Sequence, residues 1–245
     1  MARLFDMHIH TTKGSSDSNL SPEDMVLEAE RVGLFGLCVT EHSGPWDRHE
    51  FQRFAAQHNV VLIRAMEVET DMGHILAFGL DSYTEGINKA RKLRNELDKV
   101  GGFMVSAHPF RDLFHFRPYA KPLLYKEMDY VPSTMARASE HPLFQMVDAV
   151  EVANGGTAQR ENRFALSVAE HLGLRVTGGS DAHSRNGLGR CVTAFDGEIH
   201  TADEFMKALR SSQFYPAVLT PDNQDSGGSW VTSPEPFTGR ESDGD

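Results

Sequence analysis

The sequence has few cysteines, no long apolar run and a deficit of positive charge. Its two cysteines, Cys38 and Cys191, lie in apolar stretches and are too far apart for a zinc-finger pattern. No apolar run approaches the ~20 residues that cross a bilayer, and the N-terminus has no apolar signal-peptide core. We therefore expect a cytoplasmic protein with free, buried thiols and no membrane partner.

The charge balance is acidic, with 24 Lys and Arg against 35 Asp and Glu and a formal net charge of -11. Proteins that bind duplex nucleic acid usually present a basic face, so this balance argues against a nucleic-acid partner. A phosphorylated small molecule remains possible, because bound cations can supply a local positive field. The sequence leaves the oligomeric state open.

Short β-like runs alternate with helical segments along the chain. Strands are predicted at 3–8, 36–40, 60–69, 74–80, 102–107, 147–152, 174–178 and 191–195. Helices are predicted at 22–32, 84–100, 157–172 and 201–210. This alternation predicts an α/β fold with a mostly parallel sheet, open or closed into a barrel, in which a tight turn at 70–73 makes one antiparallel hairpin.

The composition divides the chain into one folded domain and a tail. Residues 1–220 have enough length for a single domain, whereas residues 221–245, rich in Ser, Gly, Asp and Glu, are predicted to be a disordered acidic tail. Residues 111–135 contain three prolines among aromatics and form a long irregular connection. Such connections often serve as lids or binding loops.

Histidine is unusually abundant, with 12 residues, and many of them sit at the ends of predicted strands. In order, these ends carry His8 and His10, Glu41 with His42, Glu67 and Glu69, His74, His108, and Asp181 with His183. Any one pair is explained as a surface feature, but chance would not place six at successive strand ends. Parallel α/β folds build their active sites at that edge, so the set predicts a metal site.

Alternation along a strand favours shared ligation. Side chains at i and i+2 project from one face, so His8 and His10 can bind one cation, and a carboxylate such as Glu67 can bridge two cations. Glu69 is an alternative to Glu67. The other six histidines are mostly expected at the surface, with His115 left open; they are His49, His58, His115, His141, His171 and His200.

These motifs resemble the polymerase and histidinol phosphatase superfamily, the PHP domain, over residues 4–212. The resemblance rests on DMHIHTT at 6–12 with SSD at 15–17, VTEH at 39–42, MEV at 66–68, GH at 73–74, AHP at 107–109 and SDAH at 180–183. Residues 190–212 resemble the PHP-associated C-terminal segment. The resemblance implies a distorted (β/α)7 TIM-like barrel, in a single domain, with two or three divalent cations.

The resemblance also implies the ligands of those cations. It places one cation with His8, His10, Glu67 and Asp181, a second with Glu67, His74 and His108, and a third with Asp17, His42 and His183. Glu151 is expected to support the site from behind. Histidine and carboxylate ligands together suit Zn, Mn or Fe, and the sequence does not choose among them.

The expected activity is hydrolysis of a small phosphorylated metabolite, a phosphomonoester or phosphodiester such as a nucleotide or a histidinol-phosphate-like compound, by a metal-bridged hydroxide. Asp181 is expected to accept a proton, and His42 or His183 to assist the leaving group. Arg111 is the first choice for binding phosphate, because guanidinium suits phosphate oxygens. Its rivals are Lys13, Arg160, Arg163 and Arg185.

Two other functions stay open at this point. One is a PHP-type 3′-5′ exonuclease or proofreading module, which the acidic balance argues against. The other is an amide or lactone hydrolase of the amidohydrolase-like class, whose chemistry needs no phosphate-binding arginine. A non-catalytic scaffold ranks last, since the full set of candidate ligands is present. The identity of the substrate stays open.

Overall fold

The computed structural model describes residues 2–114, 121–211, 213–219 and 230–232. The strands are β1 (Arg3–Ile9), β2 (Gly36–Glu41), β3 (Val61–Thr70), β4 (Gly73–Phe78), β5 (Phe103–Ser106), β6 (Ala149–Asn154), β7 (Arg175–Gly179), β8 (Cys191–Phe195), β9 (Phe214–Leu219) and β10 (Trp230–Thr232). The α-helices are α1 (Pro22–Val32), α2 (Arg48–Ala55), α3 (Ala90–Val100), α4 (Met135–Ser139), α5 (Gln159–Leu172) and α6 (Ala202–Ser211). Short 3-10 turns are η1 (Leu123–Tyr125), η2 (Pro142–Gln145) and η3 (Arg185–Gly187).

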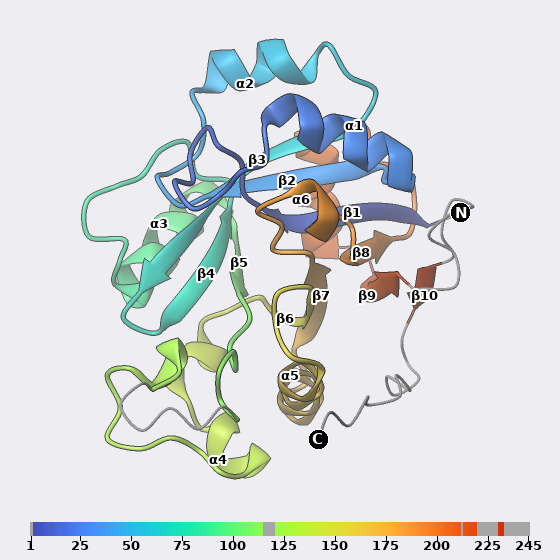
Figure 1. Cartoon of the computed structure of the whole chain (residues 1–245). Helices are drawn as coiled ribbons and strands as arrows, with labels where there is room; N and C mark the ends of the chain where they lie inside the picture. Colours follow the sequence, from blue (N-terminus) through green and yellow to red (C-terminus); the bar gives the residue numbers. More distant parts are fainter. Residues whose placement is uncertain (1, 115–120, 212, 220–229, 233–245) are drawn as a thin grey trace.

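Strands β1 to β7 follow one another in sequence order around a nearly closed barrel, as the (β/α)7 prediction requires (Figure 1). The ring closes where the segment after β7 meets β1, through a parallel bridge between Ile9 and Ala182. There the Asp181 amide donates to the His8 carbonyl at 2.7 Å, and the His10 amide donates to the Ala182 carbonyl at 3.0 Å. A Cβ at Gly179 would lie 2.5 Å from the Cβ of His8, so this approach requires glycine.

One strand of the ring runs against the others. Strand β4 pairs antiparallel with both β3 and β5, which confirms the predicted hairpin, while the other pairs among β1 to β7 are parallel. Because the β3–β4 turn is tight, the first residues of β4 lie beside the last residues of β3. His74, near the start of β4, therefore reaches the same rim as the carboxyl ends of its neighbours.

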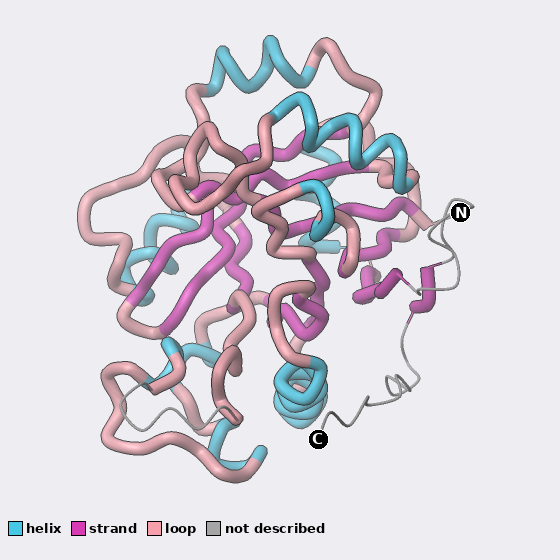
Figure 2. The backbone as a smooth tube through the Cα atoms, viewed as in Figure 1, coloured by secondary structure: helices cyan, strands magenta, loops and turns pink. Residues whose placement is uncertain are grey.

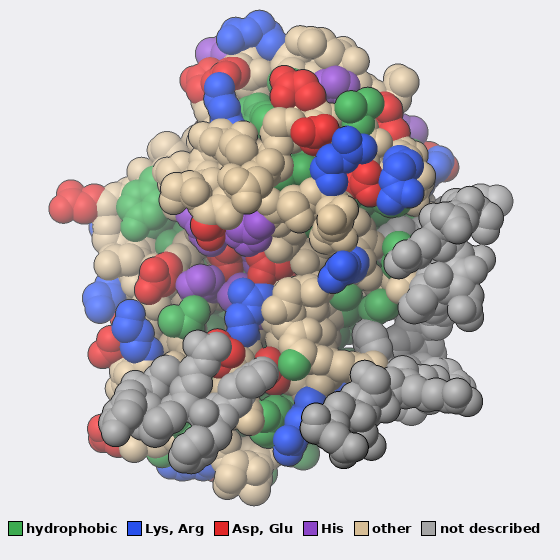
Figure 3. All heavy atoms as spheres, in the orientation of Figure 1, with side chains coloured by type: hydrophobic (Ala, Val, Ile, Leu, Met, Phe, Trp, Pro, Cys, Tyr) green, Lys and Arg blue, Asp and Glu red, His purple; other side chains and the backbone are tan. Residues whose placement is uncertain are grey.

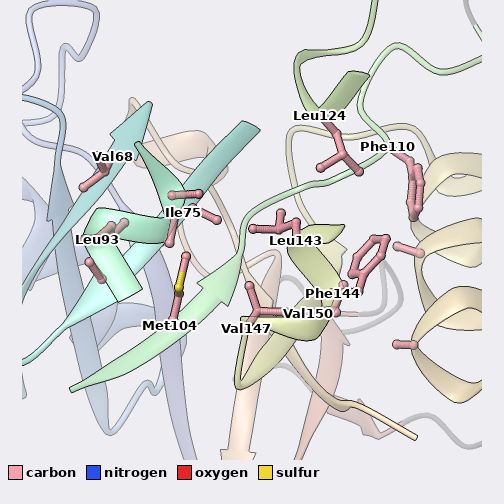
Figure 4. Close-up of a cluster of buried hydrophobic side chains, with 14 of the residues drawn as sticks. Val68, Ile75, Leu93, Met104, Phe110, Leu124, Leu143, Phe144, Val147 and Val150 are labelled. Carbon is pink, nitrogen blue, oxygen red and sulfur yellow. The ribbon is translucent and has the colours of Figure 1, made fainter. Parts of the chain in front are cut away.

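Helices and short turns cover the outside of the barrel, with α1 and α2 over the side formed by β2 and β3 and α5 near β6 and β7 (Figure 2). Helix α1 begins as its sequence predicts: the Ser21 hydroxyl accepts from the Asp24 amide at 3.1 Å, and the helix ends at Gly33 in the left-handed region. Apolar side chains from β4, β5, α3 and the 123–147 region pack together in one buried cluster (Figure 4).

Three features differ from the sequence-based expectation. The helix expected over 84–100 begins only at Ala90, because residues 84–89 form turns around Gly86, whose φ is +83°. Helix α2, capped by Asp47, helix α4 and strands β9 and β10 were not predicted. Strand β8 was predicted as a strand, but it pairs antiparallel with β1, outside the parallel ring.

The expected disordered tail at 221–245 lies outside the described residues, apart from Trp230–Thr232, which pair antiparallel with β9. Of the 111–135 connection, residues 111–114 and 121–135 are described and include η1. Among the helices in the described ranges, none combines the length and the apolar character that a bilayer span needs.

Candidate metal centre

Each of the seven barrel strands brings a polar side chain to one rim. They are His8 from β1, His42 after β2, Glu67 from β3, His74 from β4, His108 after β5, Glu151 from β6 and Asp181 after β7. Figure 3 shows histidine and acidic side chains gathered at the middle of one face of the molecule. The strand-end pattern of the sequence thus corresponds to a single cluster in space.

The deepest group consists of His8, His10, Glu67 and Asp181, whose ligand atoms all lie within 4.8 Å of one another. The Nε2 atoms of His8 and His10 each lie 3.2 Å from Glu67 Oε2. They lie 3.5 and 3.3 Å from Asp181 Oδ1, respectively. All four side chains are almost fully buried.

The two buried imidazole nitrogens make this group a candidate cation site. His8 Nε2 and His10 Nε2 have no hydrogen-bond partner among the described residues, although both face two carboxylates. A buried polar atom left without a partner is costly, so such an atom usually marks a missing ion or water. Two imidazoles and two carboxylates around one point fit a divalent cation of the Zn, Mn or Fe type.

A second group shares Glu67. The other oxygen of that carboxylate, Oε1, lies 2.8 Å from His74 Nδ1 and 2.9 Å from His108 Nε2. The ligand atoms of these three residues also lie within 4.8 Å of one another. Glu67 therefore has one oxygen in each group, which is the arrangement that a bridging carboxylate needs.

A third group lies nearer to solvent. His10, His42 and His183 bring ligand atoms within 4.8 Å of one another. The exposed carboxylate of Asp17 lies 3.5 Å from His42 Nε2 and 3.3 Å from His183 Nε2. The side chains of His42 and His183 are about one-third exposed, at 34% and 32%, so this group faces incoming solutes.

The carboxylates of the cluster are held in the ionised form. Burial alone raises the pKa of Glu67, but the charge of His8 and the adjacent imidazoles of His10, His108 and His74 lower it well below its ordinary value. Burial likewise raises the pKa of Asp181, and His8, His10, His108 and Arg111 lower it well below the ordinary range. A carboxylate of such low pKa is a good cation ligand and a weak proton acceptor.

Outer hydrogen bonds fix how the two deepest imidazoles point. The Nδ1 of His8 lies 3.0 Å from Glu151 Oε1, which lies behind the cluster as expected. The Nδ1 of His10 lies 3.2 Å from the Ser15 hydroxyl, and that hydroxyl donates to Glu41 at 2.6 Å. Since Ser15 has one hydrogen and gives it to Glu41, it accepts from His10 Nδ1–H, which leaves the Nε2 lone pair facing the cation site.

Sequence reasoning gave no such role to Ser15, Glu41 or Asn154. Glu41 is fully buried and also accepts from the Thr11 amide at 3.1 Å and the Trp46 indole at 2.8 Å. Asn154 donates to Glu151 at 2.9 Å. Their positions at strand ends were the available signal, since Glu41 ends β2 and Asn154 ends β6.

Two candidate ligand residues have unusual backbones. His108 has φ +29° and Asp181 has φ +56°, values that residues with a Cβ rarely adopt. The His108 amide donates to Glu151 at 2.9 Å, and the Asp181 amide is held by the β1 contact described above. Strained residues fixed by their surroundings are typical of functional sites.

Among the basic residues considered for binding phosphate, Arg111 is the one whose printed contacts include a residue of the cluster. Its Nη2 contacts Asp181 and donates to Asn154 Oδ1 at 2.9 Å, and its Nε donates to Thr157 at 3.1 Å. The rivals contact other groups. Lys13 pairs with Glu50 at 2.5 Å and Arg185 with Asp24 at 3.2 Å, while the Arg160 guanidinium lies over the Phe114 ring; Arg163 has a buried Nε.

Other expectations change with the structure. Glu69 cannot replace Glu67, because its side chain is 64% exposed and pairs with Lys126 at 3.5 Å.

His141, expected at the surface, is 2% exposed and accepts from the Leu143 amide; burial lowers its pKa to about 4. His115 lies outside the described residues. Cys38 and Cys191 are free and buried, which raises the pKa of both thiols.

Comparison with known families gives two matches that together span most of the chain. The profile described as PHP domain matches residues 6–154, and the profile described as PHP-associated matches residues 159–214. The second match begins at residue 159, well before residue 190, where the PHP-associated segment was expected to begin. Error-prone DNA polymerases of Mycobacterium bovis and Mycobacterium tuberculosis are 31% identical over 80 residues, which is 33% of this chain and 7% of the polymerase.

Two solved structures share the fold. PsfC from Pseudomonas syringae PB-5123 aligns with a TM-score of 0.60 and 20% identity, covering 91% of this chain and 93% of PsfC. A two-domain protein from Bacteroides vulgatus, containing a predicted PHP-like metal-dependent phosphoesterase, aligns with a TM-score of 0.60 and 21% identity. That alignment covers 88% of this chain and 64% of the other. At these identities the likeness concerns the fold alone.

The hydrogen bond to His10 can be tested by substitution. Ser15→Ala removes the acceptor that orients His10, and we expect the affinity for Zn²⁺ to fall by about 10–100-fold, the usual effect of losing such a partner. Competition with a chromophoric chelator measures the affinity. Ser167→Ala is the matched control, because its exposed hydroxyl donates to the Arg163 carbonyl. An unchanged affinity in Ser15→Ala would contradict this role.

The charge state of the metal-free cluster predicts proton release. Burial lowers the pKa of His8 and His10, but Asp181, Glu67 and, for His8, Glu151 raise both above the ordinary value. Below these raised pKa values both imidazoles carry a proton that a cation must displace, so cation affinity should increase as the pH rises through them. Calorimetry of Zn²⁺ binding at pH 7, in buffers of different ionisation enthalpy, should show net proton release. Buffer-independent heats would contradict this expectation.

Proposed function

Since the chain belongs to the PHP domain family, we propose that it is a metal-dependent phosphoesterase that hydrolyses a small phosphorylated metabolite. The observation that carries the proposal is the pair of buried, unpartnered Nε2 atoms of His8 and His10 beside the Glu67 and Asp181 carboxylates. A cluster of this composition has a clear use in hydrolysis. Divalent cations bound there lower the pKa of water and neutralise charge on a phosphoryl group.

The geometry supports three ligand sets in this proposal. His8, His10, Glu67 and Asp181 would hold one cation; Glu67, His74 and His108 a second; His42, His183 and Asp17 a third. His10 also lies within reach of the third set. The donors are imidazoles and carboxylates without thiolate, so Zn, Mn and Fe all fit.

The chain's own residues have separable tasks in this proposal. Arg111 lies beside Asp181 with its guanidinium partly exposed, where it can bind a phosphate oxygen and orient the ester. Asp181 stays ionised and acts as a ligand, and its low pKa argues against the proton-accepting task first expected of it. His42 and His183, the more exposed imidazoles, remain our choice for assisting the leaving group.

The similarity to error-prone DNA polymerases supports a rival function, trimming of DNA 3′ ends. That similarity spans 80 residues and 7% of the polymerase, and the net charge of -11 provides little attraction for a polynucleotide. A gel assay on single-stranded DNA separates the two functions. The amide or lactone hydrolase is disfavoured by Arg111 at the cluster, since that chemistry has no phosphate to bind; competitive inhibition by inorganic phosphate would favour the phosphoesterase.

The proposal predicts activity that depends on the cluster. Purified protein loaded with Mn²⁺ or Zn²⁺ should hydrolyse p-nitrophenyl phosphate or a nucleoside monophosphate. His10→Ala should lose bound metal by elemental analysis and at least about 100-fold in kcat/KM, because the imidazole lies between two ligand groups. His200 is exposed and is not part of the cluster, so His200→Ala should change neither the bound metal nor kcat/KM.

An inert wild-type protein, metal-loaded and assayed on a broad panel of phosphomonoesters and phosphodiesters, would overturn the proposed function. So would a His10→Ala variant that keeps both metal and activity.

A further inference from the structure

A cavity of about 220 Å³ opens directly beside the second ligand group. His74 and His108 of that group line the cavity, together with Arg111. The rest of its lining comes from three chain segments and is mostly apolar: Met72 and Gly73; Ser106, Ala107, Pro109 and Asp112; and Lys121, Pro122, Leu123 and Leu124. The cavity therefore combines side chains that suit an anion with apolar surface that suits an organic group.

The apolar wall is a fixed part of the fold. Leu124, in η1, is 2% exposed and packs in the buried cluster with Phe110 and Leu143 (Figure 4). Gly73 lets η1 approach β4 closely, since a Cβ there would lie 3.3 Å from Leu124 Cα. Its neighbour Leu123 lines the cavity and is 38% exposed, so its apolar surface is accessible to a group that enters the cavity.

Besides His74, His108 and Arg111, the charged side chains of the lining are Lys121 and Asp112. Lys121 already donates to the Met128 carbonyl, and Asp112 is the one carboxylate among the described lining residues. The volume is also informative. It falls below the ~300–1,000 Å³ of sites for drug-sized ligands, so it suits a compact group.

A larger cavity of about 400 Å³ near His42 is a poorer place for the organic group of a phosphate ester. Its lining includes the three carboxylates of Glu69, Asp71 and Glu127. Two of them are paired with lysines across the opening, Asp71 with Lys89 at 3.4 Å and Glu69 with Lys126 at 3.5 Å. These charged side chains, three carboxylates and two lysines, leave little apolar surface for an organic group.

We propose that the cavity between His108 and η1 receives the organic group of a phosphomonoester, that this group is compact and largely apolar, and that Leu123 selects for it. The inference rests on the proposed function. In the reaction, one water attacks phosphorus, the phosphorus–oxygen ester bond breaks, and the products are inorganic phosphate and an alcohol whose oxygen takes a proton. The phosphoryl group lies at the His74, His108 and Arg111 end, and the alcohol portion lies along Leu123 and Leu124.

The test separates binding of the organic group from binding of phosphate. Leu123→Asn keeps the size of the side chain but removes its apolar surface. With p-nitrophenyl phosphate as substrate, we expect KM to rise about fivefold to tenfold, the size of a lost apolar contact. The inhibition constant of inorganic phosphate, which has no organic group, and the metal content should stay within about twofold of wild type. Leu123→Met, which keeps an apolar side chain, should have the wild-type KM.

Tyr83→Asn is the matched control, because Tyr83 is 47% exposed and lines the other cavity. An unchanged KM in Leu123→Asn, an equal rise in the inhibition constant of phosphate, or a larger rise in KM for Tyr83→Asn would each overturn the placement of the organic group. A wild-type protein inert on all phosphomonoesters overturns the proposed function itself, and this inference falls with it.

Discussion

The Glu67 carboxylate is the contact on which the rest of the site depends. It is 2% exposed, yet it lies within 3.4 Å of nitrogen atoms of five imidazoles, those of His8, His10, His42, His74 and His108. Leaving a buried charge without positive partners costs about 3–5 kcal/mol, so this carboxylate requires either protonated histidines or cations around it. Because its two oxygens face different histidines, one residue joins two ligand groups into a single centre.

The barrel makes that convergence possible. The nearly closed ring of strands brings β1, β3, β5 and β7 to one rim, where β1 contacts the residues after β7. The reversed strand β4 adds His74 to the same rim because it starts where β3 ends. Outside the ligands, Glu151 and the Ser15–Glu41 pair hold His8 and His10 in orientation. The η1 turn then forms the wall of the cavity next to them.

The sequence predicted the parts of the site that follow from local rules and from family resemblance. Alternation along a strand placed His8 and His10 on one face, the strand-end pattern brought His108 and Asp181 to the same edge, and the resemblance added Asp17. The sequence could not reveal the Ser15 hydrogen bond, because that contact depends on how the loop after β1 folds back onto Glu41. Nor could it separate Glu67 from Glu69, since both fit the same alternation and differ only in depth below the rim.

Anomalous diffraction from crystals grown with Mn²⁺ tests the central claim most directly. The account predicts a peak at about 2.0–2.3 Å from Glu67 Oε2 and the Nε2 atoms of His8 and His10, and a second peak on the Oε1 side with His74 and His108. It would be contradicted by a map in which Glu67 keeps its histidine contacts and the metal peaks lie elsewhere on the protein, or in which no peak appears.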